Sequence, residues 1–185
     1  MSAIAQLWMP ILVTAVLIFV TSSLIHMVFK WHNADYRQLM NEDDVRAAVR
    51  AASPAPGQYV IPYCADMKEM GGETMMKKFA EGPVAFVTVR KNGPPEMGAT
   101  FVMWFAFTVA VAAFAGWLAM AAYSGKVIAH AAGQMVGLVS FIAYGGGSLP
   151  LGIWMGKPWP SVAKDLLDAL IYGVISGLVF MWLWP

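Results

Sequence analysis

Charged residues and cysteine are scarce in this sequence. Of its 185 residues only 12% are Asp, Glu, Lys or Arg, whereas 59% are hydrophobic, which is far from the composition of soluble globular proteins. The single cysteine, Cys64, excludes a disulfide within the chain and fits a reducing compartment. The formal net charge of +1 argues against a nucleic-acid partner. Together these features indicate an integral membrane protein.

Motifs of the common enzyme classes are missing as well. The sequence contains no C-x-x-C-H segment, Gly-rich phosphate loop, zinc-protease motif or serine-nucleophile elbow. The middles of the long apolar stretches contain no Asp, Glu, Lys or Arg. Asp165 and Asp168 stand near the start of the last stretch, beside Lys164. Pumps and proton-coupled transporters commonly carry ionisable residues at depth. The sequence therefore favours a protein that is neither an enzyme nor an ion-coupled transporter.

Four apolar runs are long enough to cross a membrane as helices. A hydrocarbon core of about 30 Å requires about 20 residues of helix, in which each segment satisfies its own backbone hydrogen bonds. The first run has no positive residue before it and no small-x-small cleavage site, so we interpret it as a retained span and not as a secretion signal. The runs cover residues 4–29, 99–123, 127–147 and 162–184.

The sequence thus predicts an all-α membrane protein with a small α+β extramembrane domain inserted between transmembrane helices 1 and 2. Residues 1–29 form the first transmembrane helix, residues 30–98 the small domain, and residues 99–185 helices 2–4. The short basic loops on the cytoplasmic side of a membrane protein set its orientation. Of the twelve Lys and Arg residues, only Lys126 falls outside the side that carries the 30–98 loop. We therefore expect a bacterial cytoplasmic membrane protein with both termini periplasmic and this loop cytoplasmic.

The loop itself contains recognisable secondary-structure signals. Asn41, followed by acidic residues 42–44, predicts the capped start of a helix. Residues 58–63 and 83–90 are predicted as strands and residues 73–80 as a short helix. Two strands alone are marginally stable and leave open edges. The domain should therefore be covered by the membrane, by a second copy or by another protein.

Small residues recur at four-residue spacing in the last two runs. Such stripes let two backbones approach closely, which is the main source of helix association in lipid. The alternative is that Gly and Ala are simply common in membrane helices. We expect the two stripes to pack against each other or against a partner. Their residues are Ala129, Gly133 and Gly137 in the third run and Ala169, Gly173 and Gly177 in the fourth.

Among the three histidines, His130 is the candidate cofactor ligand. His26 lies near the inner end of the first run and His130 near the outer end of the third, so about 20 Å along the membrane normal separates them and they cannot share a haem. His130 alone could hold a tetrapyrrole against the small residues beside it, or it could, with Gln134, hydrogen-bond to a neighbouring helix. His32 and Asp35 could ligate a metal or form a solvated interfacial pair.

A second candidate site lies in the 30–98 loop. Cys64, Met67 and Met70 offer the soft sulfur ligands that suit Cu(I). Their spacing matches no well-defined copper motif, and no histidine is adjacent. The alternative is that these methionines fill gaps where the domain packs against the bilayer or a partner.

The segments KWHNADYRQL, NEDDVRAAV, PGQYVIPYCADMKEM, GPVAFVTVRKNGPPEMG and DALIYGVISG…WLWP carry a resemblance. In these segments the sequence resembles an uncharacterised family of bacterial four-helix integral membrane proteins with a small loop domain between the first and second helices. The resemblance covers nearly the whole chain and implies the same architecture. It brings no activity or catalytic residue with it.

Two functions remain as hypotheses. The first is a non-catalytic accessory or structural subunit of a larger respiratory or photosynthetic membrane complex, with no cofactor of its own and with other integral membrane subunits and the lipid bilayer as partners. The second is a tetrapyrrole-binding or copper-binding membrane protein, with the ligands at His130 or at Cys64, Met67 and Met70. A membrane enzyme is the third and weakest alternative, since the sequence offers no nucleophile or base in a credible setting.

Overall fold

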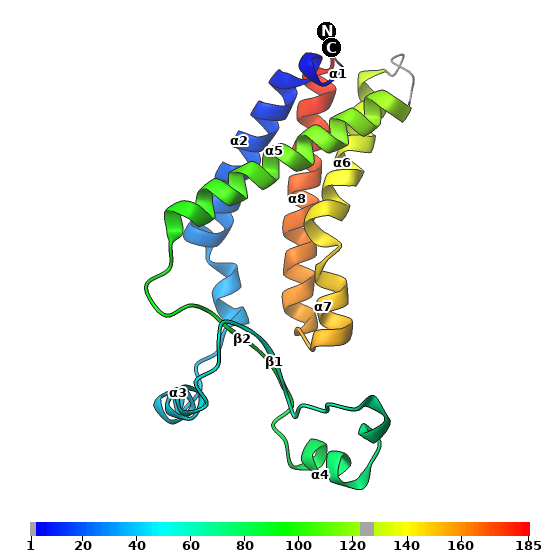
Figure 1. The fold of residues 1–185 in the computed structure, drawn as a ribbon. Coiled ribbons are helices and arrows are strands. Elements are labelled where there is room, and N and C mark those ends of the chain that lie inside the picture. The colour runs from blue at the N-terminus through cyan, green and yellow to red at the C-terminus, as the bar shows by residue number, and fades with distance from the viewer. Residues whose placement is uncertain (1–2, 123–127) are drawn as a thin grey trace. The chain divides into compact units, whose positions relative to one another are not determined.

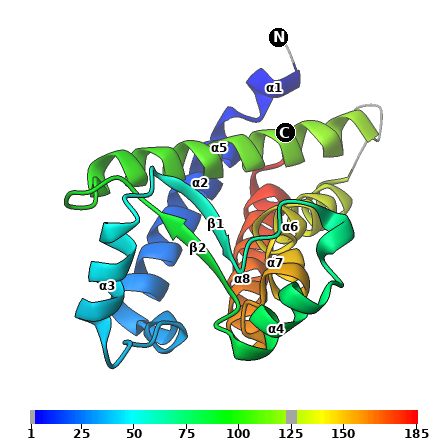
Figure 2. The same ribbon diagram turned by 60° about the horizontal axis from the view of Figure 1, so that its bottom comes forward.

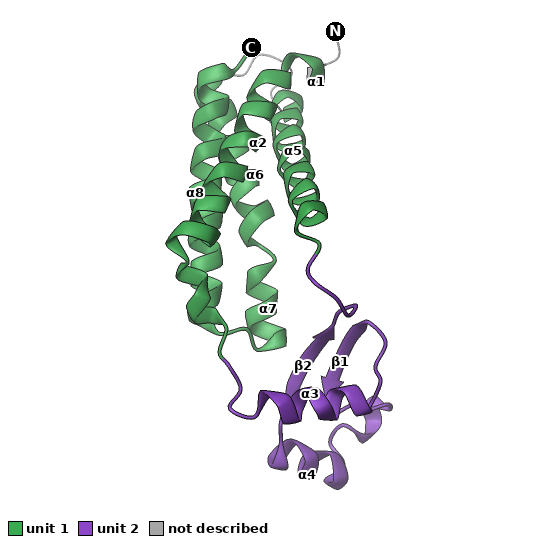
Figure 3. Ribbon diagram, turned by 90° about the vertical axis from the view of Figure 1, so that its left-hand side faces the viewer, with its two compact units in different colours: residues 1–37, 96–185 green, residues 38–95 purple. Residues whose placement is uncertain are grey.

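The computed structural model describes residues 3–122 and 128–185. The chain divides into two compact units, of which unit 1 comprises residues 1–37 and 96–185 and unit 2 comprises residues 38–95 (Figure 3). Unit 1 is made of helices, whereas the strands belong to unit 2. The described chain is therefore mainly helical, with one small sheet.

Four helices of unit 1 are long and apolar enough to cross a membrane (Figure 1), which agrees with the number of apolar runs in the sequence. The first combines α2 (Trp8–Ser23) with the π-helical η1 (Leu24–Phe29), after a short α1 (Ala3–Gln6). The second is α5 (Met97–Ala122), the third combines α6 (Ala129–Gly145) with α7 (Ser148–Met155), and the fourth is α8 (Trp159–Leu183).

Several helix ends differ from the sequence prediction, and two of these differences have a clear local cause. The third span was expected to end at residue 147, but α7 continues it to Met155, where Gly156 adopts a left-handed conformation with φ of 69°. A left-handed glycine is a common helix stop. The fourth helix begins at Trp159 and not at residue 162, because Pro158 and Pro160 suit the first turn of a helix, where no backbone N–H is needed. The turn expected around residues 124–126 lies outside the described residues.

Helices α6 and α8 lie side by side and share the small-residue stripes (Figure 1). A methyl group built on Gly137 would lie 3.0 Å from the carbonyl oxygen of Gly173, and one built on Gly177 would lie 2.9 Å from that of Gly133. Only glycine leaves room for two backbones at this separation. The stripes therefore serve contact within the chain.

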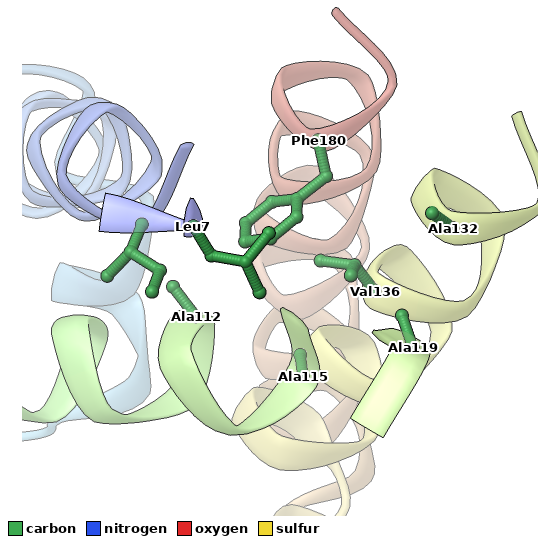
Figure 4. Packing of buried hydrophobic residues seen from close by; sticks show 8 residues of the cluster. Leu7, Ala112, Ala115, Ala119, Ala132, Val136 and Phe180 are labelled. Atoms are coloured by element: carbon green, nitrogen blue, oxygen red, sulfur yellow. The ribbon is translucent and has the colours of Figure 1, made fainter. Parts of the chain in front are cut away.

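A buried apolar cluster joins α2, α5, α6 and α8 with Leu7, the residue between α1 and α2 (Figure 4). The ring of Phe180 on α8 is fully buried and rests against Gly116 on α5 and beside Leu7. The remaining members are mostly small, so the helices pack around one large ring. They are Ile11, Ala112, Ala115, Ala119, Ala132 and Val136.

Unit 2 contains two strands and three short helices. Strand β1 (Gly57–Ile61) pairs antiparallel with β2 (Ala85–Val89), with Val60 opposite Phe86, and Figure 2 shows the strands side by side. The helices are α3 (Glu42–Ala51), η3 (Met67–Glu69) and α4 (Glu73–Glu81). Helix α3 starts after Asn41 with three acids in its first turn, but the Asn41 side chain makes no capping hydrogen bond. Its start is thus favoured by the charges and not by a cap.

Candidate functional site

Three ionisable side chains converge where η1, a following turn and α8 meet in unit 1. His26 lies on η1, His32 on the 3-10 helix η2 (Trp31–Asp35), and Asp168 on α8. The Nε2 atom of His32 lies 2.9 Å from Oδ2 of Asp168, and the Nε2 atom of His26 lies 3.9 Å from the same oxygen. We call these three residues the His–His–Asp centre.

The backbone between the two histidines explains why their rings meet. Lys30 adopts a left-handed conformation with φ of 54°, which ends η1 and turns the chain into η2. The rings of His26 and His32 then stack with their centroids 4.7 Å apart and their planes 3° from parallel. Segments of π-helix often occur at functional sites because they displace a side chain from the regular helical register.

Each histidine is held through its Nδ1 atom. Nδ1 of His26 donates to the carbonyl oxygen of Ser22 over 2.9 Å, and Nδ1 of His32 donates to Oδ2 of Asp35 over 2.8 Å. A carbonyl or an ionised carboxylate can only accept, so both Nδ1 atoms carry the hydrogen. The Nε2 atoms of both rings are therefore the ones that face Asp168.

Asp35 is the hub of a second layer of contacts. Its Oδ1 accepts from Nζ of Lys164 over 2.7 Å and from Oγ of Ser161 over 2.9 Å, and Lys164 also donates to the carbonyl oxygen of Trp31. The hydrogen bond from the Lys164 ammonium lowers the pKa of the Asp35 carboxyl to about 2, and those from His32 and Ser161 add to the effect. Asp35 is thus ionised at neutral pH and fixes η2 to α8.

Asp168 is the buried member of the centre. Its exposed fraction is only 5%, and its Oδ1 atom has no hydrogen-bond partner among the described residues. Lys164 pairs with Asp35, and Lys157 pairs with the neighbouring Asp165. Asp168 therefore has no Lys or Arg partner among the described residues, and only imidazole nitrogens face its Oδ2.

A cavity of about 410 Å³ opens beside the centre, within unit 1. His26 and Asp168 contribute to its wall, together with aromatic side chains from α5, α6 and α8. The hydroxyls of Tyr144 and Tyr172 are buried and have no hydrogen-bond partner among the described residues. The cavity wall thus combines aromatic rings with hydroxyl, imidazole and carboxylate groups.

The predicted cofactor and metal ligands are not members of the His–His–Asp centre. His130 lies exposed in the first turn of α6, and Gln134 is exposed one turn later. In unit 2, Met67 is 72% exposed, and Cys64 donates from Sγ to the carbonyl oxygen of Asp66. His130 and the sulfur residues stay predictions as ligands.

Sequence reasoning recognised parts of the His–His–Asp centre but not the whole. The pair His32 and Asp35 stands three residues apart and could be read from the sequence as a local contact. Asp168 was placed near the membrane interface, with no sign that it would be buried against His32, which is 136 residues away in the chain. The available signal was an aspartate inside an otherwise apolar run, near its start.

Unit 2 has its own unusual surface. Among all its residues, only Met75 is buried. No residue of β1 or β2 is buried: alternate residues of β2 are half-buried, whereas Phe86 and Tyr59 are 54% and 40% exposed. We call these two strands, of which no residue is buried, the open sheet.

Chemically, the centre brings two imidazole nitrogens and one carboxylate oxygen within 4.8 Å of one another. Such a set can coordinate a cation or exchange a proton. Catalysis of a group transfer would require, in addition, a substrate bound beside these atoms. No protein-family model, curated protein or solved structure matches this chain.

Proposed function

We propose that the protein is a non-catalytic accessory subunit of a larger bacterial membrane complex, such as a respiratory or photosynthetic one. The observation that carries this proposal is the open sheet of unit 2, which has apolar side chains on both faces and buries none of them. Four apolar helices anchor the protein in the membrane. The extramembrane domain between the first two spans supplies the surface on which a partner packs.

The register of the open sheet places its apolar residues in two groups. Val60 and Phe86 are directly opposite each other on one face, and Tyr59 and Val87 are opposite on the other. A two-stranded sheet is marginally stable in water unless another layer covers one face. A partner that covers such a surface typically buries about 800 Å² of it. We therefore infer that folding of unit 2 is completed by the partner.

The partner is an integral membrane subunit with a domain on the same side of the membrane as unit 2. The distribution of Lys and Arg favours the cytoplasmic side, with both termini periplasmic, by the positive-inside rule. The small-residue stripes of α6 and α8 pack against each other, so they are not the main surface that binds the partner. The absence of a recognisable catalytic motif supports a non-catalytic role.

Replacing Phe86 by threonine should release the chain from its complex. Threonine keeps the strand propensity but removes an exposed aromatic ring, and loss of an aromatic residue at the centre of an interface commonly costs more than about 1 kcal/mol. We expect about a tenfold larger fraction of free chain after mild solubilisation of native membranes. The particle mass, measured by native mass spectrometry, distinguishes the complex from the 20.1 kDa chain.

Thr88→Ser is the matched control, because Thr88 is exposed on the same strand and the same face as Phe86. This variant should leave the particle mass unchanged. A wild-type chain that runs alone from its native membranes contradicts the proposal. A particle made only of copies of this chain does so too, and identifies the cover of the open sheet as a second copy.

A further inference from the structure

Beyond the proposed function, and independently of it, we propose that His26, His32 and Asp168 bind one divalent transition-metal ion of the zinc type. The ligand atoms would be Nε2 of both histidines and Oδ2 of Asp168. The cavity beside the centre would supply the fourth coordination position. Four kinds of observation support this: the convergence of the atoms, the anchoring of the rings, the charge of the site and the freedom of one ligand to adjust.

The three ligand atoms are already close together. All lie within 4.8 Å of one another, and the distances from Asp168 Oδ2 to the two Nε2 atoms are 2.9 and 3.9 Å. Zinc binds imidazole nitrogen and carboxylate oxygen at about 2.0–2.2 Å, so neighbouring ligands of a tetrahedral ion are about 3.3 Å apart. These two distances lie on either side of this value and differ from it by about half an ångström, whereas the separation of the two imidazole nitrogens also depends on how the stacked rings are oriented.

The second layer holds the rings as metal-binding histidines are usually held. In such sites the nitrogen that does not bind the metal donates its hydrogen to a carboxylate or a backbone carbonyl. Here Nδ1 of His32 donates to Asp35, and Nδ1 of His26 donates to the carbonyl oxygen of Ser22. When a metal ion displaces the hydrogen from Nε2, the Nε2 lone pairs become available on the side of the rings that faces Asp168.

The charge of the centre favours a cation. A buried carboxylate without a compensating charge is costly. Lys164 compensates Asp35 and Lys157 compensates Asp165, but no Lys or Arg within the described residues pairs with Asp168. With neutral histidines, Asp35, Lys164 and Asp168 together carry one negative charge. A bound divalent ion supplies the missing positive charge, whereas without a metal the charge must come from a protonated imidazole.

The stacking of the rings identifies the ligand that moves. A metal ion lies in the plane of each ring that binds it, and the two planes here are parallel and offset. One ring therefore has to turn for both to bind. The His32 side chain is only 14% exposed and is bonded at both nitrogens, whereas that of His26 is 52% exposed. His26, whose ring can turn at the cost of shifting its hydrogen bond to Ser22, turns onto the ion, and His32 and Asp168 form the fixed part of the site.

The types of ligand atom also limit which metal ions can bind. Two imidazoles and one carboxylate suit zinc, and also cobalt, iron or nickel, better than calcium or magnesium, which prefer oxygen ligands. Three protein ligands leave the fourth position open, as in sites where zinc holds a water molecule or a small anion. The two unpartnered tyrosine hydroxyls are in the same cavity wall and could donate to such a group.

Titration of the full chain, purified in detergent and stripped with a chelator, tests the proposal. Zn²⁺ followed by calorimetry should saturate at one ion per chain with micromolar affinity or better. Co²⁺ should give the visible absorption bands of a tetrahedral complex with nitrogen and oxygen ligands. Asp168→Asn keeps the shape of the side chain but removes a ligand. Loss of a group that only supports a ligand weakens metal binding about 10- to 100-fold, so this variant should weaken Zn²⁺ binding by more than that.

His26→Gln should fold as the wild type does, because this side chain is half exposed. Its affinity for Zn²⁺ should fall to a similar degree as that of Asp168→Asn. His130→Gln is the matched control: it removes a histidine from the same unit at an exposed position away from the centre and should bind as the wild type does. Wild-type chain without saturable Zn²⁺ or Co²⁺ binding overturns the proposal and assigns the positive charge to a protonated His32. Equal affinity in wild type, His26→Gln and Asp168→Asn overturns it as well. The measurement needs no partner protein, so its result is separate from that of the accessory role.

Discussion

Replacing Gly133 by valine should destabilise the folded helices by about 3 kcal/mol, the upper end of the cost of overpacking. A methyl group at this position would lie 2.6 Å from the carbonyl oxygen of Gly177 and would also collide with the side chain of Met181. The methionine can move, but the backbone oxygen cannot without separating α6 from α8. We expect a lower midpoint when the detergent-solubilised protein is unfolded with increasing SDS.

Gly98→Val is the matched control for this prediction. Gly98 also lies in a membrane-spanning helix, α5, and a methyl group built there meets no atom within 4 Å. The same residue is introduced in both variants, so differences in helix propensity cancel. If the two variants unfold at the same SDS concentration, close contact of the backbones in α6 and α8 does not contribute to stability.

Phe180→Ala should cost about 2–3 kcal/mol in the same measurement. The ring is fully buried in the cluster of Figure 4, where Gly116 leaves space for it and Leu7 covers it. In lipid the unfolded reference state also surrounds the ring with apolar groups, so the loss comes from packing and not from transfer out of water. The cavity term of about 24 cal/mol per Å³, applied to the roughly 100 Å³ removed, gives this range.

Leu178→Ala on the same helix is the comparison for Phe180. Leu178 is 59% exposed and faces detergent or lipid, so truncating it should change stability by less than about 0.5 kcal/mol. A large loss at Leu178 and a small loss at Phe180 would mean that the buried face of α8 has been assigned to the wrong side.

The sequence predicts the helices of unit 1 well because a membrane span is a local property. Length and apolar composition decide whether a segment crosses a bilayer, and its backbone hydrogen bonds close within the segment. The four runs are found again as helices in the structure. Their ends are less predictable: α7 extends the third span past three successive glycines to Met155, and prolines 158 and 160 move the start of α8 to Trp159.

The pairing of the stripes shows a different limit. The four-residue spacing of Gly133, Gly137, Gly173 and Gly177 marks two surfaces that allow close contact. The same spacing would suit contact with another protein. Only the structure shows that the glycines of α6 face those of α8, because the choice depends on how the helices are arranged and not on either helix alone.

By itself, the amino-acid sequence determined that this chain forms four apolar helices and a small sheet-containing segment, and it marked His32 and Asp35 as neighbours. The tertiary structure alone decided that Asp168 faces His32 and His26 and that unit 2 leaves its sheet uncovered. The physical reason is the range of the interactions. Hydropathy and helix signals act over a few turns, whereas the His–His–Asp centre joins residues 136 positions apart through a left-handed turn at Lys30 and the packing of α8, which no local pattern encodes.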